Sequence, residues 1–482
     1  MTPNVVWIQS DEHRPDSLGC YGSSWAKTPN LDALAKRGTL FTTAVCQSPV
    51  CVPSRASQLT ARYPQEINTL HNDVCEEAMR IAGDVDFDIL PPGTVTFPEW
   101  LASRGGFQTV TFGKSHIPPW RPWQAERLVV NDERYAGYYS LNESFDEEEH
   151  HVVKRPGGAS IILAGTYPGG LDNPSRAITD EAIDWLAHGR DRRRPFLLRV
   201  SHNWPHTPVL PPAPFDQLYD PADLPVRTFD EQAYKTRSSW DRHMADAHRV
   251  WELDDRQLRQ VWKDYMGLCA YVDYEVGRLL AALEDQRLGD STVVLFSSDH
   301  GKSLGEWGAT EKGFFDSEVW RVPFIWSWPG VIPQGETRSE PCELIDTGRT
   351  VTGLLGLDSP ANWRGRDLFA SVGDRGEAFG QIGWPSADVP RGPRRRDDHW
   401  NCLRVAIRTE RYRMDETWMA AGRRVPFELG DGNLFDLVVD PQERCNLWGS
   451  PDKAAVVAEL RERIERWWCT LDRPARTFGA QR

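Results

Sequence analysis

Cys51-Val52-Pro53-Ser54-Arg55 is followed closely by Leu59-Thr60-Ala61-Arg62. The pattern predicts a helix over Pro53–Thr60, with Cys51 just before it. The free backbone N–H groups and the dipole at a helix start favour an anion. Arg55 lies one turn further along the same face, so its guanidinium can reach back to that point. These residues indicate a nucleophile beside an anion site, whereas a lone cysteine at a helix start is more often an ordinary buried residue.

The size and composition of the chain are those of a globular protein. Its 482 residues are too many for one ordinary core and favour two domains. Hydrophobic residues make up 40% and charged residues 26%, which excludes a mainly disordered or collagen-like chain. A formal net charge of −14 disfavours non-specific binding to nucleic acid, although local cations can still hold an anionic substrate. The nine cysteines include no Cys-x-x-Cys pair, which argues against a disulfide framework or a structural zinc site.

The sequence carries no evident targeting signal. No apolar run approaches the roughly 20 residues that a membrane span needs. The residues after Met1 lead directly into a strand, without a basic leader or a long apolar stretch. We therefore expect a cytoplasmic protein with neither a membrane nor a nucleic acid as partner. Its oligomeric state is not readable from the sequence.

Short apolar runs alternate with stretches of helical periodicity, which predicts an α/β sheet flanked by helices. The expected strands are Val5–Gln9, Leu40–Val45, Gln108–Phe112, Pro195–Val200, Thr292–Phe296 and Pro323–Trp326. The expected helices are Leu31–Lys36, Pro53–Thr60, Phe97–Ser103, Ala177–Ala187 and Asp255–Glu284. Polar residues repeatedly follow the strand ends, the edge at which open α/β sheets bind ligands.

The C-terminal part of the chain has a different character. Residues 371–400 are rich in Gly, Pro and Arg and read as a linker or loop. Beyond them we expect short strands at Leu403–Arg408, Tyr412–Met414 and Leu434–Leu437, and a closing amphipathic helix at Ala454–Trp468. We therefore predict a catalytic domain over residues 1–370 and a C-terminal subdomain over residues 371–482, with a small antiparallel sheet and a terminal helix.

The stretch around Cys51 resembles the motif of the sulfatase family, within the alkaline phosphatase superfamily. That motif is C-x-P-S-R followed by L-T-G-R, and this chain departs from it at Ala61, where the family usually has glycine. Further landmarks follow in family order up to about Leu447. The resemblance implies a large, mixed, mostly parallel sheet sandwiched by helices, with a smaller C-terminal α+β subdomain. It also implies that a separate maturation enzyme oxidises Cys51 to formylglycine.

Two stretches resemble the metal segments of the family. Residues 10–16, Ser-Asp-Glu-His-Arg-Pro-Asp, correspond to a segment that usually reads Asp-Asp before Arg-Pro-Asp, so Glu12 replaces an aspartate with an arm one methylene longer. Residues 296–301, Phe-Ser-Ser-Asp-His-Gly, correspond to the second segment. The implied metal ligands are Asp11, Glu12, Cys51, Asp299 and His300. Such a mostly oxygen site favours one divalent cation, calcium before magnesium or manganese; the alternative is that these acids are solvated loop ends.

Three further stretches resemble the family's cationic positions: G-K-x-H at residues 113–116, P-H-x-P at residues 205–208, and a lysine after the Asp-His pair at Lys312. The implied catalytic residues are Cys51, Arg55, Lys114, His116, His206 and Lys312. By resemblance, His116 manages the protons of the formylglycine hydrate, and His206 and Lys312 serve the leaving group. Lys114 and Arg55 hold the sulfate or the hydrate, since preorganised cations stabilise the charge of a sulfuryl group.

Several residues flank these motifs without matching a catalytic position. We expect structural or supporting roles for His71, His202 and Lys302. Asn72 is a candidate substrate contact. Trp120 and Trp123 are candidates for stacking on a sugar or aryl ring, with packing in the core or at the rim as an equal alternative. The arginines at residues 394–396 are more often a solvated loop than a binding site.

The resemblance implies hydrolysis of a small-molecule or carbohydrate sulfate ester to an alcohol and sulfate. One alternative is a phosphonate monoester or phosphodiester hydrolase of the same superfamily, in which hydroxyl residues typically replace the lysine and histidine of G-K-x-H. Lys114 and His116 favour the sulfatase. Another alternative is a non-catalytic metal- or anion-binding protein of the same fold, which the set of matched positions disfavours. The alcohol half of the substrate is not specified by the sequence.

Overall fold

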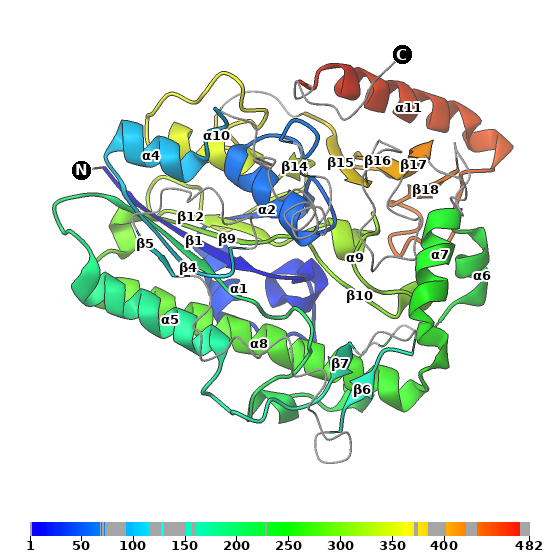
Figure 1. Ribbon diagram of the computed structural model, residues 1–482, viewed down its shortest axis with the longest axis horizontal. Helices are drawn as coiled ribbons and strands as arrows, with labels where there is room; N and C mark the ends of the chain where they lie inside the picture. The colour runs from blue at the N-terminus through cyan, green and yellow to red at the C-terminus, as the bar shows by residue number, and fades with distance from the viewer. Residues whose placement is uncertain are drawn as a thin grey trace, which may run out of the picture.

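A computed structural model of the protein is shown in Figure 1. It describes residues 2–67, 69, 72, 93–115, 127–129, 151–156, 161–224, 226, 229–370, 375–383, 402–420 and 431–472. Within this part of the chain, an eight-stranded sheet forms the centre of the molecule. Its strands, in spatial order, are β13 (Glu336–Arg338), β2 (Thr39–Phe41), β12 (Phe324–Ser327), β9 (Thr292–Ser298), β1 (Asn4–Ser10), β8 (Phe196–Ser201), β4 (Gln108–Gly113) and β5 (Arg127–Val129).

The central sheet is mixed but mostly parallel. Strand β1 pairs in parallel with both β8 and β9, and β4 pairs in parallel with β8 and β5. Only β12 runs antiparallel to its neighbours, β9 and β2. All seven residues of β1 are buried, which explains its continuous apolar run, because helices cover both faces of the sheet. The predicted fold class is confirmed.

Two sets of helices sandwich the sheet. Figure 1 shows α5 (Pro174–Asp184) and α8 (Asp255–Asp285) below it, and α2 (Cys51–Thr60), α4 (Phe97–Gly105) and α10 (Asp346–Leu354) above it. A further helix, α1 (Pro29–Lys36), packs with α8. Alternate residues of β1 point to opposite faces, so Val6 and Ile8 join the α8 core while Val5 and Trp7 join the α2 core. No described helix is both long and apolar enough to cross a membrane.

One predicted strand is wrong. Residues 40–45 do not form a single strand, because the chain turns at residues 42–43 and divides the apolar run. The first piece is β2 of the central sheet, and the second is β3 (Ala44–Val45), which pairs instead with β14 (Cys342–Glu343). The helix expected at residues 177–187 also begins earlier, at Pro174, because Asn173 caps its first turn by accepting the N–H of Arg176.

A second, four-stranded antiparallel sheet follows in the chain. It has the order β15 (Ala378–Gly383), β16 (Cys402–Arg408), β17 (Tyr412–Ala420) and β18 (Gly432–Asp436). Helix α11 (Ala454–Cys469) packs its apolar face on this sheet, with Leu460, Ile464 and Trp467 among the buried contacts. The predicted small antiparallel sheet and terminal helix are confirmed, while the boundary at residue 370 stays a prediction.

A buried cluster of charges links the small sheet to Arg237 and to residues 316–317. Asp316, just before α9 (Ser317–Trp320), pairs with Arg237 and lies 3.3 Å from Nη2 of Arg413 on β17. Glu443 lies 2.9 Å from the same Arg413 nitrogen and accepts the hydroxyl of Ser317 at 2.5 Å. Burial works to raise the pKa of Glu443, but Arg413 and its neighbours hold it at about 2, so the carboxylate stays ionised. The ionised Glu443 therefore depends on Arg413 for its counter-charge.

We predict that Arg413→Met destabilises the protein by about 3–5 kcal/mol, because it leaves buried carboxylates without their counter-charge. The matched control is Arg411→Met, since Arg411 is 55% exposed in its ion pair with Asp436. Because the guanidinium of Arg411 is solvated, this pair should contribute no more than about 1 kcal/mol. Thermal and urea unfolding of both variants measure the difference. Equal effects of the two substitutions would contradict the structural role of the cluster.

Candidate active site

Cys51 begins α2, a helix whose ten residues are all buried. The residue before it, Val50, is extended and provides no side-chain cap. The amide of Val52 instead donates to Oδ1 of Asn72 at 2.8 Å, which satisfies one free N–H of the first turn. Asn72, named as a candidate substrate contact, therefore lies at the start of the nucleophile helix. Its contact with substrate stays a prediction.

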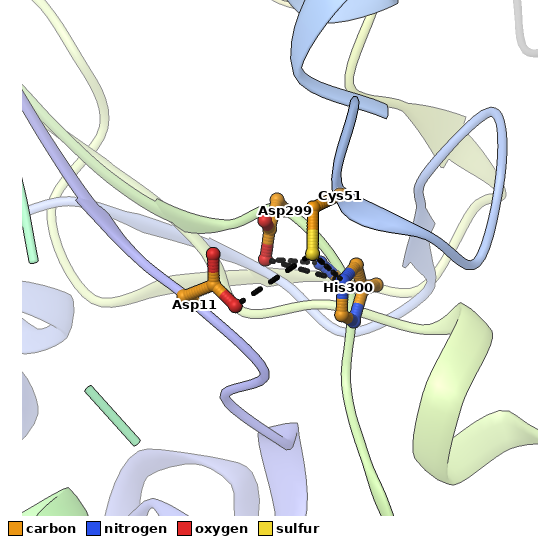
Figure 2. Close-up of side chains that lie close together, drawn as sticks. All are labelled: Asp11, Cys51, Asp299 and His300. Carbon is orange, nitrogen blue, oxygen red and sulfur yellow. Dashed lines mark hydrogen bonds and ion pairs between the residues drawn. The ribbon is translucent and has the colours of Figure 1, made fainter. Parts of the chain in front are cut away.

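Four side chains converge where β1 and β9 end. These strands are parallel neighbours with Ser10 opposite Ser298, so the residues that follow them emerge at the same edge. Figure 2 shows that Asp11, Asp299 and His300 point toward Cys51. Each of the four offers a donor atom, and all these atoms lie within 4.8 Å of one another. Sγ of Cys51 lies 3.1 Å from Nε2 of His300 and 3.9 Å from Oδ1 of Asp11.

The donor atoms of this group suit a divalent cation. Nδ1 of His300 lies 2.8 Å from the carbonyl oxygen of Gly301 and donates to it, which fixes the ring with Nε2 facing Cys51. Burial works to lower the pKa of His300, but Asp299 and Cys51 raise it to about 9. Burial and the nearby Asp11 raise the pKa of Asp299 despite Arg55. Two crowded carboxylates and an imidazole are ligands that a hard or borderline metal ion accepts.

Arg55 lies behind the carboxylates rather than in an open pocket. Its side chain is fully buried, with Nε 2.7 Å from Oδ2 of Asp299 and Nη2 2.7 Å from Oδ2 of Asp11. A third nitrogen, Nη1, donates to the hydroxyl of Ser201 at 2.9 Å. The guanidinium thus provides the counter-charge that two buried carboxylates require. A direct contact of Arg55 with sulfate stays a prediction.

Lys114 enters the site from the end of β4. Gly113 has a φ of 91°, and a Cβ there would lie 2.1 Å from the carbonyl oxygen of Ser201, so the close turn requires glycine. Nζ of Lys114 then lies 2.7 Å from Oδ2 of Asp11. Burial and Cys51 work to raise the pKa of Asp11, but Lys114 and Arg55 hold it well below its usual range. The predicted catalytic residue His116 lies outside the described residues, as do His71, Trp120, Trp123 and residues 394–396.

Lys312 and His206 form the more open side of the site. Nζ of Lys312 lies 3.1 Å from Sγ of Cys51 and 3.1 Å from Nε2 of His206. Their side chains are 15% and 16% exposed, whereas those of Asp11, Arg55, Asp299 and His300 are inaccessible. Burial works to lower the pKa of Lys312, but Cys51 and Glu12 raise it well above its ordinary value. Among the described side chains around position 51, this ammonium and this imidazole are therefore the ones most accessible to solvent.

Glu12, a predicted metal ligand, faces a different set of partners. It is not one of the four residues around Cys51 but forms a second group with Asp11 and His206. Its Oε1 lies 2.5 Å from Nζ of Lys312, and its Oε2 lies 2.8 Å from Nζ of Lys302. Sequence reasoning gave Lys302 only a supporting role and missed this contact. The available signal was a lysine four residues after the end of a buried strand, where a buried ammonium needs a nearby carboxylate.

His202 agrees with the structural role expected for it. Its amide donates to the carbonyl oxygen of Gln9 at 2.8 Å, so it links β8 to β1 at the sheet edge. Burial lowers the pKa of His202 to about 4, which keeps the ring neutral.

Two family models match the chain. Residues 3–357 match the model described as Sulfatase, and residues 305–468 match the one described as N-sulphoglucosamine sulphohydrolase, C-terminal. Among curated proteins, the chain is 25% identical over 520 residues to an N-acetylglucosamine-6-O-sulfatase of Bacteroides thetaiotaomicron, covering 96% of this chain and 86% of that protein.

Solved structures share the fold. A phosphonate monoester hydrolase of Agrobacterium radiobacter has a TM-score of 0.77 and 23% identity, covering 97% of this chain and 95% of that one. A protein in complex with its substrate, D-glucosamine-2-N,6-O-disulfate, has a TM-score of 0.71 and 20% identity, covering 99% of this chain and all of that one. The Sulfatase model spans most of the sequence, and its match agrees with the motif around Cys51. The chain belongs to the sulfatase family, the sulfuric ester hydrolases of the alkaline phosphatase superfamily.

Proposed function

We propose that this protein hydrolyses a sulfate ester of a carbohydrate to an alcohol and inorganic sulfate, using formylglycine at position 51 and one divalent cation. The observation that carries the proposal is the position of the Cys51 sulfur, 3.1 Å from both Nε2 of His300 and Nζ of Lys312. The reacting group at position 51 therefore lies between the candidate metal ligands and the more open side of the site, which carries Lys312 and His206.

The residues that would hold the cation are Asp11, Asp299, His300 and position 51. A divalent ion there would neutralise sulfate oxygens and promote ionisation of the nucleophile, and we favour calcium, with magnesium or manganese as alternatives. Oxidation of Cys51 by a maturation enzyme would supply an aldehyde, which adds water to form a hydrate. One hydroxyl of the hydrate would attack sulfur as the bond to the alcohol oxygen breaks. The other hydroxyl would then lose its proton as C–O cleavage releases sulfate and restores the aldehyde.

His206 and Lys312 are placed to serve the leaving group. When the bond from sulfur to the alcohol oxygen breaks, that oxygen gains negative charge and needs a proton. Nδ1 of His206 lies 2.5 Å from the carbonyl oxygen of Thr207, which orients Nε2 toward Lys312. Either group can donate the proton to the alcohol oxygen, while the ammonium also stabilises the developing charge. Lys114 and Arg55 keep Asp11 ionised on the opposite side.

The proposed carbohydrate substrate rests on the substrates of similar proteins. One is a sulfatase of N-acetylglucosamine, and one structural neighbour was solved with a disulfated glucosamine. A phosphonate monoester hydrolase is the second candidate, because a neighbour with that activity has a TM-score of 0.77. Lys114 of the G-K-x-H motif, 2.7 Å from Asp11, favours the sulfatase.

We predict that, after expression with a formylglycine-generating enzyme, the peptide containing Cys51 carries an aldehyde in place of the thiol. Cys51→Ala should then lower kcat/KM for an aryl sulfate by more than about 10³-fold, because no nucleophile remains. Peptide mass spectrometry and steady-state kinetics measure these effects. Cys445→Ala, which removes an exposed thiol, is the control and should retain activity. Full activity of a protein with an unmodified Cys51 would refute the mechanism.

Removal of the metal should inactivate the matured enzyme. We expect dialysis against a chelator to lower the rate by at least about 10²-fold, since the charge of the sulfate would lose its main counter-ion. Elemental analysis before and after dialysis identifies the ion, and re-addition of calcium, magnesium or manganese should restore activity selectively. A metal-free protein that retains its full rate would contradict this assignment.

Matched aryl sulfates and aryl phosphonates distinguish the two candidate activities. We predict a kcat/KM at least about 10-fold higher for the sulfate, with some hydrolysis of the phosphonate because both are tetrahedral anionic esters. A set of sulfated monosaccharides, assayed for released sulfate, then tests the carbohydrate substrate. A clear preference for the phosphonate would reverse the assignment.

A further inference from the structure

Glu12 is a buried carboxylate whose two oxygens are both held by ammonium groups. Oε1 lies 2.5 Å from Nζ of Lys312 and 3.3 Å from Nε2 of His206, and Oε2 lies 2.8 Å from Nζ of Lys302. The backbone reinforces this direction: Glu12 has a φ of 61°, its N–H donates to Oδ1 of Asp299, and its carbonyl oxygen accepts the hydroxyl of Tyr265. The side chain of Glu12 therefore reaches Lys312 and His206 on the more open side of the site.

Lys302 connects Glu12 to a second glutamate. Its fully buried Nζ lies 2.7 Å from Oε1 of Glu311 as well as 2.8 Å from Glu12. Glu311 lies in β11 (Thr310–Glu311), which pairs with β10 (Ser303–Leu304), so the short hairpin fixes Glu311 beside Lys302. The other oxygen of Glu311 accepts the hydroxyl of Thr207, next to His206, at 3.5 Å. Two lysines and two glutamates therefore form a charge-balanced chain that begins and ends at the leaving-group side.

Asp11 and Glu12 differ in the carboxylate oxygens that remain available to a metal ion. Among the described residues, only Oδ2 of Asp11 is paired with cations, from Arg55 and Lys114, while Oδ1 is directed at Cys51. Both oxygens of Glu12 are engaged by lysines. Glu12, Asp11 and His206 could also form a small donor group, but a divalent ion there would lie among the ammonium groups that already neutralise Glu12. Position 12, where the family usually has an aspartate, therefore has a different role in this chain.

We propose that Glu12, fixed by Lys302, is a positioning residue that aligns Lys312 and His206 for proton transfer to the leaving oxygen, and is not a ligand of the metal. The inference rests on the proposed sulfatase reaction. In that reaction the bond from sulfur to the alcohol oxygen breaks, and the proton passes from His206 or Lys312 to that oxygen. The carboxylate of Glu12 fixes the donor atoms and takes no part in the bond changes.

The first measurement separates a ligand from a positioning residue. Calcium binding to the matured wild type, Glu12→Gln and Asp11→Asn is measured by isothermal titration calorimetry, with Asp11→Asn as the reference for a lost ligand. We expect Kd to change by less than about threefold in Glu12→Gln, and to rise by at least about 100-fold in Asp11→Asn. A loss of affinity in Glu12→Gln comparable to that in Asp11→Asn would overturn the proposal.

The second measurement reports the alignment of the proton donors. At saturating metal, kcat/KM is measured for aryl sulfates whose phenols differ in pKa. Glu12→Gln should lose about 100-fold on the poorest leaving group and less than about 10-fold on the best, because only the former needs the proton. The control is Glu275→Gln, which changes another buried glutamate in an ion pair, with Arg278 of α8 at 2.8 Å, and should leave this dependence unchanged. An equal loss on all leaving groups would overturn the proposal.

Lys302 provides an independent check. Lys302→Met removes the charge and should reproduce the leaving-group dependence of Glu12→Gln, whereas Lys302→Arg should restore most of the lost activity. Failure of Lys302→Met to reproduce that dependence would overturn the role of Lys302. If Lys302→Met does not fold, Glu12→Gln still decides the question. If the matured wild type hydrolyses no sulfate ester, the proposed function fails, and the calcium measurement still decides whether Glu12 is a ligand.

Discussion

The site depends on one interaction: the pairing of Arg55 with two carboxylates, Asp11 and Asp299, at inaccessible strand ends. Two negative charges at the tips of neighbouring parallel strands would repel each other in a medium of low dielectric constant. The guanidinium lies between them because α2 packs above the sheet and points its first turn at that edge. The same helix carries Cys51, so the group that neutralises the acids also fixes the position of the nucleophile. The position of α2 on the sheet therefore determines both the charge balance of the two acids and the location of the nucleophile.

The fold and the edge of the sheet could be predicted from local patterns. Strand β1 reads as a continuous apolar run because both of its faces are covered, and the acids that follow it mark the binding edge. The division of residues 40–45 between two sheets was not predictable, because it depends on β14, far along the chain. The partners of Glu12 could not be predicted either, because Lys302 lies 290 residues away in the sequence. A motif identifies residue types at a site, whereas ion pairs between distant segments decide which atoms remain available.

Charge balance also reconciles an acidic protein with an anionic substrate. The net charge of −14 belongs to the chain as a whole, while the site gathers Arg55, Lys114, Lys302 and Lys312 within hydrogen-bonding distance of carboxylates. A bound divalent ion would add further positive charge to this region. The surrounding negative field would then favour release of the sulfate product, while the short-range contacts govern its binding.

The charge cluster around Arg413 supports the loop that follows β9 at the catalytic edge of the central sheet. Asp316 and Glu443 fix the start of α9, and the backbone of this helix accepts the N–H of Gly301 at Val319 and that of Lys302 at Glu318. Through α9, the small sheet thus stabilises the loop that carries His300. A shortened chain lacking β15–β18 would lose Arg413 and with it this support. Such a fragment would keep every candidate metal ligand and catalytic residue and still lose the contacts that fix the start of α9.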